Sequence, residues 1–312
     1  MSIARATTSP AASADAWVAR FRKAEETLFR NHNLTVLESY LDLDAPRLRV
    51  RILETGEGPP VILLPGLGAV AATWAPLLAR LQGMRLIALD RPGCGLSDSL
   101  DLTGTDLRRF SVGIVASVAR ALRLERVSII GNSIGGTTGL WFATEHANRV
   151  DRLVLLGAPP FVMDAQAPLS MRLMSISFVA RRALSRSTPA AADELFVRMG
   201  HPHGMVRGDL LELFLASRHL PGYTDGFIRL IQGATGLGGR RVAAPARELA
   251  TLDCPTLLIW GRNDTHGPFS RGERLTRTLP HARLELVGSG HLPWLDEPDE
   301  CARLTQDFLR PN

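Results

Sequence analysis

Ser133 is the residue with the clearest capacity for chemistry, because it lies in the pattern Gly131-Asn132-Ser133-Ile134-Gly135. A β-branched run precedes the pattern, and an Ala- and Leu-rich helical pattern follows it to about His146. A serine at such a strand-to-helix turn exposes its hydroxyl as a nucleophile, and a side chain at position 131 or 135 would collide with neighbouring backbone. Alone, the pattern also fits a glycine-rich turn with an incidental serine.

Two later loops supply the groups that a nucleophilic serine needs. Asp264 follows the apolar run that ends at Trp260, and His291 lies in a loop after the next such run. An imidazole can take the serine proton near neutral pH, and a carboxylate fixes its tautomer and stabilises the imidazolium. We therefore expect Ser133, Asp264 and His291 to form a catalytic triad. Asp164 is an alternative acid, and a surface-loop histidine is the alternative interpretation of His291.

The elements that must position these side chains alternate between buried strands and helices. This alternation predicts an α/β fold with a mostly parallel central sheet flanked by helices. In such sheets ligands bind at the carboxyl ends of the strands. Two half-exposed antiparallel strands are expected at Leu34–Leu41 and Arg47–Glu54. Further strands are expected at Val61–Leu64, Met84–Leu89, Val127–Ile130, Arg152–Leu156, Thr256–Trp260 and Leu284–Val287, and the first two of these are expected to be buried.

The alternation stops after Gly157, and the chain is mainly helical and rich in Met and Phe until about Arg247. We interpret residues 159–247 as an inserted helical cap or lid, and residues 34–158 together with 248–312 as the core. Residues 1–33 are expected to form a tail, through about Ala16, and a helix from Asp15 to about Arg30 that packs on the outside of the domain.

Four motifs in this order make the sequence resemble the α/β-hydrolase fold family, from about Leu34 to Leu309. They are Asp90–Ser97, Gly131–Gly135, Gly261–Asp264 and the Gly290-His291 pair followed by Pro293. The resemblance implies an oxyanion hole formed by the backbone N–H groups of Leu67 and Ile134. The family typically has His-Gly before the first donor, whereas this chain has Pro65-Gly66. The Asp90 loop is expected to be structural, with Cys94 a buried filler.

Within that family, a serine at the elbow argues against the haloalkane dehalogenase and epoxide hydrolase branches, which use aspartate. The segment Asn132–Gly136 is similar to the elbow of the meta-cleavage C–C bond hydrolases and their esterase relatives. The apolar residues Ala69–Ala72 favour an esterase, because the C–C hydrolases bind dienoate acids with polar groups in this loop. We expect hydrolysis of small to medium apolar carboxylic esters through an acyl-enzyme. The alternatives are C–C bond hydrolysis, acyl transfer and ligand binding without turnover.

The composition limits the classes of binding partner that we expect. The net charge of +5 comes from scattered residues, and Lys23 is the only lysine among 36 basic residues, a pattern typical of a GC-rich bacterial genome. We therefore expect no nucleic-acid partner, and no run is long enough for a membrane span. Three distant cysteines argue against disulfides and fit the cytoplasm. His201 and His203 have no third ligand nearby in the sequence, so we expect no metal or other cofactor. The sequence leaves the oligomeric state open.

Overall fold

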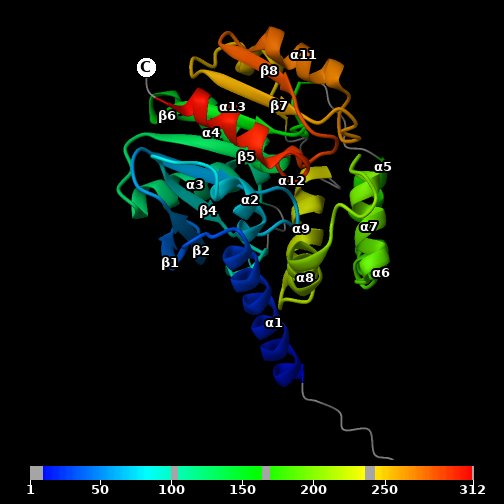
Figure 1. Ribbon diagram of the computed structural model, residues 1–312. Helices are drawn as coiled ribbons and strands as arrows, with labels where there is room; N and C mark the ends of the chain where they lie inside the picture. The colour runs from blue at the N-terminus through cyan, green and yellow to red at the C-terminus, as the bar shows by residue number, and fades with distance from the viewer. Residues whose placement is uncertain (1–9, 100–104, 164–168, 236–242, 311–312) are drawn as a thin grey trace, which may run out of the picture.

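The computed structural model describes residues 10–99, 105–163, 169–235 and 243–310. Its eight strands form one sheet in the order β1-β2-β4-β3-β5-β6-β7-β8. Strands β3 to β8 are parallel, whereas β1 and β2 are antiparallel, as the sequence predicted (Figure 1). The strands are β1 (Leu37–Asp44), β2 (Arg47–Thr55), β3 (Pro60–Leu64), β4 (Arg85–Leu89), β5 (Val127–Asn132), β6 (Val150–Leu156), β7 (Thr256–Trp260) and β8 (Ala282–Leu286).

The central strands are mostly apolar because both of their faces are covered. Along β3, Ile62 and Leu64 belong to one buried cluster while Val61 and Leu63 belong to another on the opposite face. The first cluster includes residues of α3 (Leu107–Ala121), α4 (Ile134–Glu145) and α11 (Phe269–Thr278). The second includes residues of α1 (Pro10–Asn31), the short α2 (Ala75–Leu78) and α13 (Pro298–Leu309). The predicted α/β architecture is confirmed.

Residues 159–247, here called the insertion, connect β6 to β7. Within its described part the insertion contains helices and no named strand, in agreement with the predicted helical segment, and α5 to α7 lie at its outer side (Figure 1). Its helices are α5 (Leu169–Met174), α6 (Ser177–Leu184), α7 (Pro189–Arg198), α8 (Gly208–Ser217), α9 (Tyr223–Thr235) and α10 (Ala246–Leu249). The remaining short elements are α12 (Pro293–Asp296) and two 3₁₀ turns at Ala71–Trp74 and Ala147–Arg149.

Helix α1 begins at Pro10, so the prediction that a tail extends to Ala16 and the helix starts at Asp15 was wrong. It runs beside α8 of the insertion (Figure 1). Arg20 pairs with Glu212 at 2.7 Å, and the Trp17 ring stacks on His219 with centroids 4.0 Å apart. Among the described residues, no helix is long and apolar enough to cross a membrane.

A buried ion network joins α1 to the sheet. Arg51 of β2 pairs with Glu25 of α1 at 2.7 Å and with Asp90 at 3.0 Å. Because burial weakens ionisation and several carboxylates share one guanidinium, the pKa of Glu25 rises to about 7. Removing one partner from such a network leaves an uncompensated buried charge, so these residues stabilise one another in place. The network ends at Asp90, which in turn holds a loop of the candidate site.

Candidate active site

The predicted elbow has the strained geometry that its glycines imply. Ser133 lies between β5 and α4 with φ 53° and ψ −123°, a left-handed conformation that L-residues rarely adopt. A Cβ atom on Gly135 would lie 2.0 Å from the carbonyl oxygen of Leu64, and one on Gly131 would lie 2.6 Å from the Cα of Gly136. The prediction that both positions require glycine is therefore confirmed, and the Ser133 side chain is held at the carboxyl end of the sheet.

Asp264 and His291 meet, as predicted. The Nδ1 atom of His291 lies 2.8 Å from Oδ2 of Asp264, and both side chains are buried. Asp264 also accepts hydrogen bonds from the backbone N–H groups of Ala158 and His266, each at 2.8 Å. Burial acts to raise the pKa of Asp264, but His291 and these N–H groups outweigh it and hold the pKa below its usual range. The alternative acid, Asp164, lies outside the described residues.

The pairing fixes the state of the His291 ring. A carboxylate can only accept, so Nδ1 carries a proton, and in the neutral tautomer Nε2 carries the free lone pair. The Nε2 atom is buried and has no hydrogen-bond partner among the described residues. The structure therefore brings Asp264 and His291 together, but the Ser133 hydroxyl makes no hydrogen bond to His291 Nε2.

Asn132, whose role the sequence did not reveal, joins the histidine loop to the elbow. Its side-chain amide donates to the carbonyl oxygens of Leu156 at 2.7 Å and of His291 at 3.0 Å. Because Asn132 immediately precedes Ser133, these bonds fix the His291 backbone to the strand that carries the serine. The loop after β3 lies against the same point, since a Cβ on Gly66 would be 3.3 Å from the Cβ of Ser133.

The loop after β3 is supported by Asp90 rather than by a histidine. The Oδ1 atom of Asp90 accepts the N–H of Ala71 at 2.7 Å, and its Oδ2 atom accepts the N–H of Leu96 at 3.0 Å. The structural role predicted for the Asp90–Ser97 loop is confirmed. The sequence did not reveal that Arg51 is the ion-pair partner of Asp90. Leu67 lies in the loop after β3 and Ile134 is the first residue of α4, and their N–H groups remain the predicted oxyanion donors.

Cys94 is the other possible nucleophile at this edge of the sheet, and its environment makes it less suited to catalysis than Ser133. Cys94 is buried, and burial raises the pKa of its thiol to about 11, so it is protonated near neutral pH.

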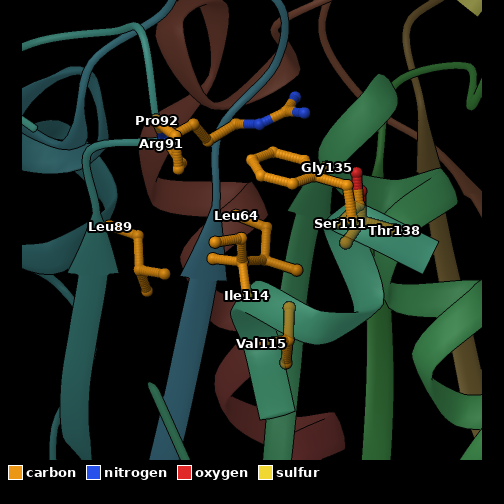
Figure 2. A pocket seen from close by; sticks show the side chains of 10 residues that line it. Leu64, Leu89, Arg91, Pro92, Ser111, Ile114, Val115, Gly135 and Thr138 are labelled. Carbon is orange, nitrogen blue, oxygen red and sulfur yellow. The ribbon is translucent and has the colours of Figure 1, made fainter. Parts of the chain in front are cut away.

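A cavity of about 20 Å³ lies behind the elbow, lined by Leu64, Gly135 and the buried side chain of Arg91 (Figure 2). Its volume suits an occupant the size of a water molecule, so it is not an acyl pocket.

The ring of His266 stacks on the ring of His291 with centroids 4.0 Å and planes 17° apart. Burial lowers the pKa of His266 to about 3, with further lowering by the His291 ring, so it is neutral near pH 7. With Asp264, the two histidines bring potential ligand atoms within 4.8 Å of one another. The in-plane lone pairs of two nearly parallel rings do not converge on one ion, which favours a packing role for His266 over metal binding.

The end of α7 and the residues that follow it, 198–200, form hydrogen bonds to both loops that carry candidate catalytic residues. We call this set of contacts the clamp. The His291 N–H donates to the carbonyl of Met199 at 3.0 Å, and the Ser289 hydroxyl donates to Gly200 at 2.7 Å. On the other loop, the Thr265 hydroxyl donates to the carbonyl of Arg198 at 2.6 Å. The insertion therefore helps to fix the distance between the loops that carry Asp264 and His291.

His201 completes this clamp, together with Asp296. The His201 ring accepts the N–H of Leu292 at Nε2, 3.2 Å away, and its Nδ1 lies 2.8 Å from Oδ1 of Asp296. The Oδ2 atom of Asp296 accepts the N–H groups of Ser289 and Gly290 at 2.9 and 2.8 Å. The sequence did not reveal this pair, because the two residues are 95 positions apart; the only signal was an isolated histidine in the insertion.

We expect His201→Ala to lower kcat by about 10- to 100-fold with little change in KM, because a small shift of a catalytic loop has effects of that size. The measurement is steady-state hydrolysis of p-nitrophenyl butyrate, with the unfolding midpoint recorded to confirm that the variant is folded. The matched control is His203→Ala, whose exposed ring pairs with Asp193 outside the clamp. An unchanged kcat in a folded His201 variant would show that the clamp does not influence catalysis.

Comparisons with known proteins come from sequence and from structure. A sequence model described as the alpha/beta hydrolase family matches residues 61–304. The chain is 30% identical over 266 residues to the 2-hydroxy-6-oxo-6-phenylhexa-2,4-dienoate hydrolase of Comamonas testosteroni, spanning 82% of this chain and 90% of that protein. It is 27% identical over 290 residues to a 2-hydroxy-6-oxononadienedioate/2-hydroxy-6-oxononatrienedioate hydrolase of Burkholderia vietnamiensis, spanning 89% and 98%.

Among solved structures, a carboxylesterase of Bacillus subtilis matches with a TM-score of 0.74 at 20% identity, covering 94% of this chain and 98% of that one. A meta-cleavage product hydrolase matches with a TM-score of 0.70 at 25% identity, covering 86% and 97%. The esterase match, at this low identity, extends to the fold alone.

Proposed function

We propose, from the premise that this chain belongs to the α/β hydrolase family and is a hydrolase, that it cleaves carboxylic esters of small to medium apolar substrates through an acyl-enzyme. The observation that carries the proposal is the buried Asp264–His291 pair, 2.8 Å apart, whose loop is hydrogen-bonded to the residue beside the strained Ser133. A histidine held by a carboxylate activates a serine nucleophile whose hydroxyl comes within hydrogen-bonding distance of Nε2.

In the proposed reaction, Ser133 Oγ attacks the ester carbonyl carbon while His291 Nε2 takes its proton. The tetrahedral oxyanion is held by the N–H groups of Leu67 and Ile134. His291 then gives the proton to the departing alcohol, which leaves Ser133 acylated. A water molecule, deprotonated by His291, attacks the acyl group and releases the acid, and the proton returns to Ser133.

The preference for apolar esters is supported by what lies over the loop after β3. A Cβ on Gly68 would lie 2.8 Å from the Tyr223 hydroxyl and 3.2 Å from the Phe227 ring, so both aromatic side chains of α9 lie against the loop. The loop itself continues with Ala69, Val70 and Ala71. Apolar walls with a few polar groups are typical of sites for uncharged small ligands. On this proposal the insertion acts as the cap over the acyl group.

A second candidate is hydrolysis of a C–C bond in a dienoate acid, and the two curated hydrolases named above favour it. Both reactions place a carbonyl between the serine and the oxyanion hole, so the elbow and the Asp264–His291 pair suit either. They differ in the charge of the substrate, because a dienoate brings a carboxylate that needs a cationic or hydrogen-bonding partner.

A substrate panel tests the two candidates. The panel contains p-nitrophenyl esters from acetate to decanoate and 2-hydroxy-6-oxo-6-phenylhexa-2,4-dienoate, all measured as kcat/KM. We expect the best ester to exceed the dienoate by about 100-fold or more, the discrimination that an unpaired buried charge produces. The reverse order would assign C–C hydrolysis instead. Stoichiometric labelling of Ser133 by a fluorophosphonate without turnover of either class would indicate a ligand-binding protein.

A further inference from the structure

Exposed apolar side chains gather on one short part of the insertion. In the described residues the large hydrophobic side chains that are exposed include Leu169 at 69%, Leu173 at 46%, Ile176 at 48% and Phe178 at 80%, all within ten positions. The others are Leu37 and Leu195, which lie elsewhere in the sequence. Single exposed apolar residues are ordinary, whereas a group of four marks an interaction surface.

These residues lie on α5, on α6 and at Ile176 between them, and a different side of this segment is fixed to the rest of the protein. Gln232 of α9 donates to the carbonyl of Ser175 at 2.9 Å, and Arg181 pairs with Asp225 of α9 at 2.6 Å. Ala180 and Leu184 of α6 are buried. The exposed apolar residues are therefore not needed to hold α5 and α6 in place.

The charged residues within this stretch of the sequence have one sign. No acidic residue occurs between Asp164 and Asp193, whereas this stretch contains four arginines. Arg181 is paired, but Arg172, Arg182 and Arg186 are exposed and have no carboxylate partner among the described residues. Arg172 follows Leu169 by three positions in α5, and Arg182 follows Phe178 by four positions in α6, which places each pair on neighbouring parts of a helix surface. We call the four apolar residues and these three arginines the α5–α6 face.

We propose that the α5–α6 face docks on an anionic lipid surface. Exposed Leu, Ile and Phe side chains beside unpaired arginines are what a helix needs to lie in the headgroup region of a bilayer with negatively charged lipids. The protein's net charge of +5 adds a long-range attraction to such a surface.

A second copy of the chain is the less suited occupant. In a two-fold contact the same face meets itself, so the three arginines would approach the three arginines of the other copy with no acidic residue of the stretch to offset them. An anionic lipid surface supplies the opposite charge to all three.

Docking at this face would orient the candidate active site. Helix α9, to which α5 and α6 are fixed, carries Tyr223 and Phe227 against the loop after β3. The docked helices would thus be linked through α9 to the loop that borders the proposed acyl site. The docking itself does not depend on the proposed function, because it concerns binding and requires no turnover.

The test is co-sedimentation of the full chain with vesicles of equal parts phosphatidylglycerol and phosphatidylcholine, against vesicles of phosphatidylcholine alone. We expect binding to the anionic vesicles only, weakened by added salt. The triple variant Arg172→Gln, Arg182→Gln, Arg186→Gln should bind about a hundredfold more weakly, from about fivefold per arginine near the surface. The double variant Ile176→Ser, Phe178→Ser should also lose binding. Unfolding midpoints establish that each variant is folded.

Matched controls carry the same chemical changes elsewhere. Leu37→Ser removes an apolar side chain that is 66% exposed on β1, and Arg47→Gln, Arg120→Gln, Arg277→Gln removes three exposed charges outside the insertion. The proposal is overturned if the wild-type chain fails to bind anionic vesicles, or if the controls reduce binding as much as the face variants. It is also overturned if sedimentation velocity shows an oligomer that Ile176→Ser, Phe178→Ser dissociates, because the face is then a contact between copies.

Discussion

Ser133→Ala is expected to lower kcat for p-nitrophenyl butyrate by about a millionfold, to the limit of detection, while KM changes little. Removing the nucleophile of a serine triad has an effect of this size, because the remaining histidine and aspartate have no group to activate. Alanine keeps the Cβ atom of serine, so the strain at φ 53° is the same in both chains. The variant should therefore fold with an unfolding midpoint close to that of the wild-type protein.

A matched control distinguishes the loss of the nucleophile from the loss of any other buried serine hydroxyl. Ser111 is a buried serine whose hydroxyl has no hydrogen-bond partner among the described residues, and it lines the small cavity behind the elbow. Ser111→Ala should leave kcat within about twofold, because no bond is lost and little volume changes. A fluorophosphonate should label the Ser111 variant and not the Ser133 variant. Undiminished ester turnover by Ser133→Ala would overturn the acyl-enzyme mechanism.

The parts of the site that local sequence determines could be predicted. The glycines at 131 and 135 report a turn in which backbone atoms approach within 2.6 Å of any added side chain, and that requirement is visible in the sequence. Asp264 and His291 could be placed because each follows a strand, the buried β7 and the partly exposed β8, and neighbouring parallel strands end at one edge of the sheet. The apolar runs at β3 and β7 also predicted strands of a central parallel sheet.

The supporting contacts could not be predicted, because they join segments that are far apart in the chain. Arg51 is 39 positions from Asp90 and 26 from Glu25, and an isolated arginine in a strand pattern gives no sign of burial. The start of α1 was missed because Pro10–Ala16 consists of small residues around one aspartate, with no apolar periodicity to follow. Proline nevertheless suits the first turn of a helix. Tertiary packing, rather than local pattern, decides each of these features.

Asp264→Asn is the second substitution with a large expected effect, a loss in kcat of about ten-thousandfold. The Oδ2 atom of Asp264 accepts two N–H groups, from Ala158 and His291, and its Oδ1 atom accepts the N–H of His266. An asparagine has only one acceptor oxygen. If its NH₂ group takes the Oδ2 position, His291 must accept at Nδ1, so the ring proton moves to Nε2 and the base is lost. If the NH₂ group takes the Oδ1 position, it faces a backbone N–H donor.

The control for Asp264→Asn is Asp296→Asn, because that carboxylate also accepts two backbone N–H groups and one histidine, but in the clamp rather than at His291. Its loss should be about 10- to 100-fold, like that of His201→Ala, because it moves a loop without changing the tautomer of the base. The pH profile of kcat/KM separates the two effects. The Asp296 variant should keep the wild-type shape at a lower level, whereas the Asp264 variant should change the shape, because its histidine no longer presents the same tautomer. Equal losses with equal profiles would show that Asp264 acts only by holding the loop, and the triad would then need a different acid.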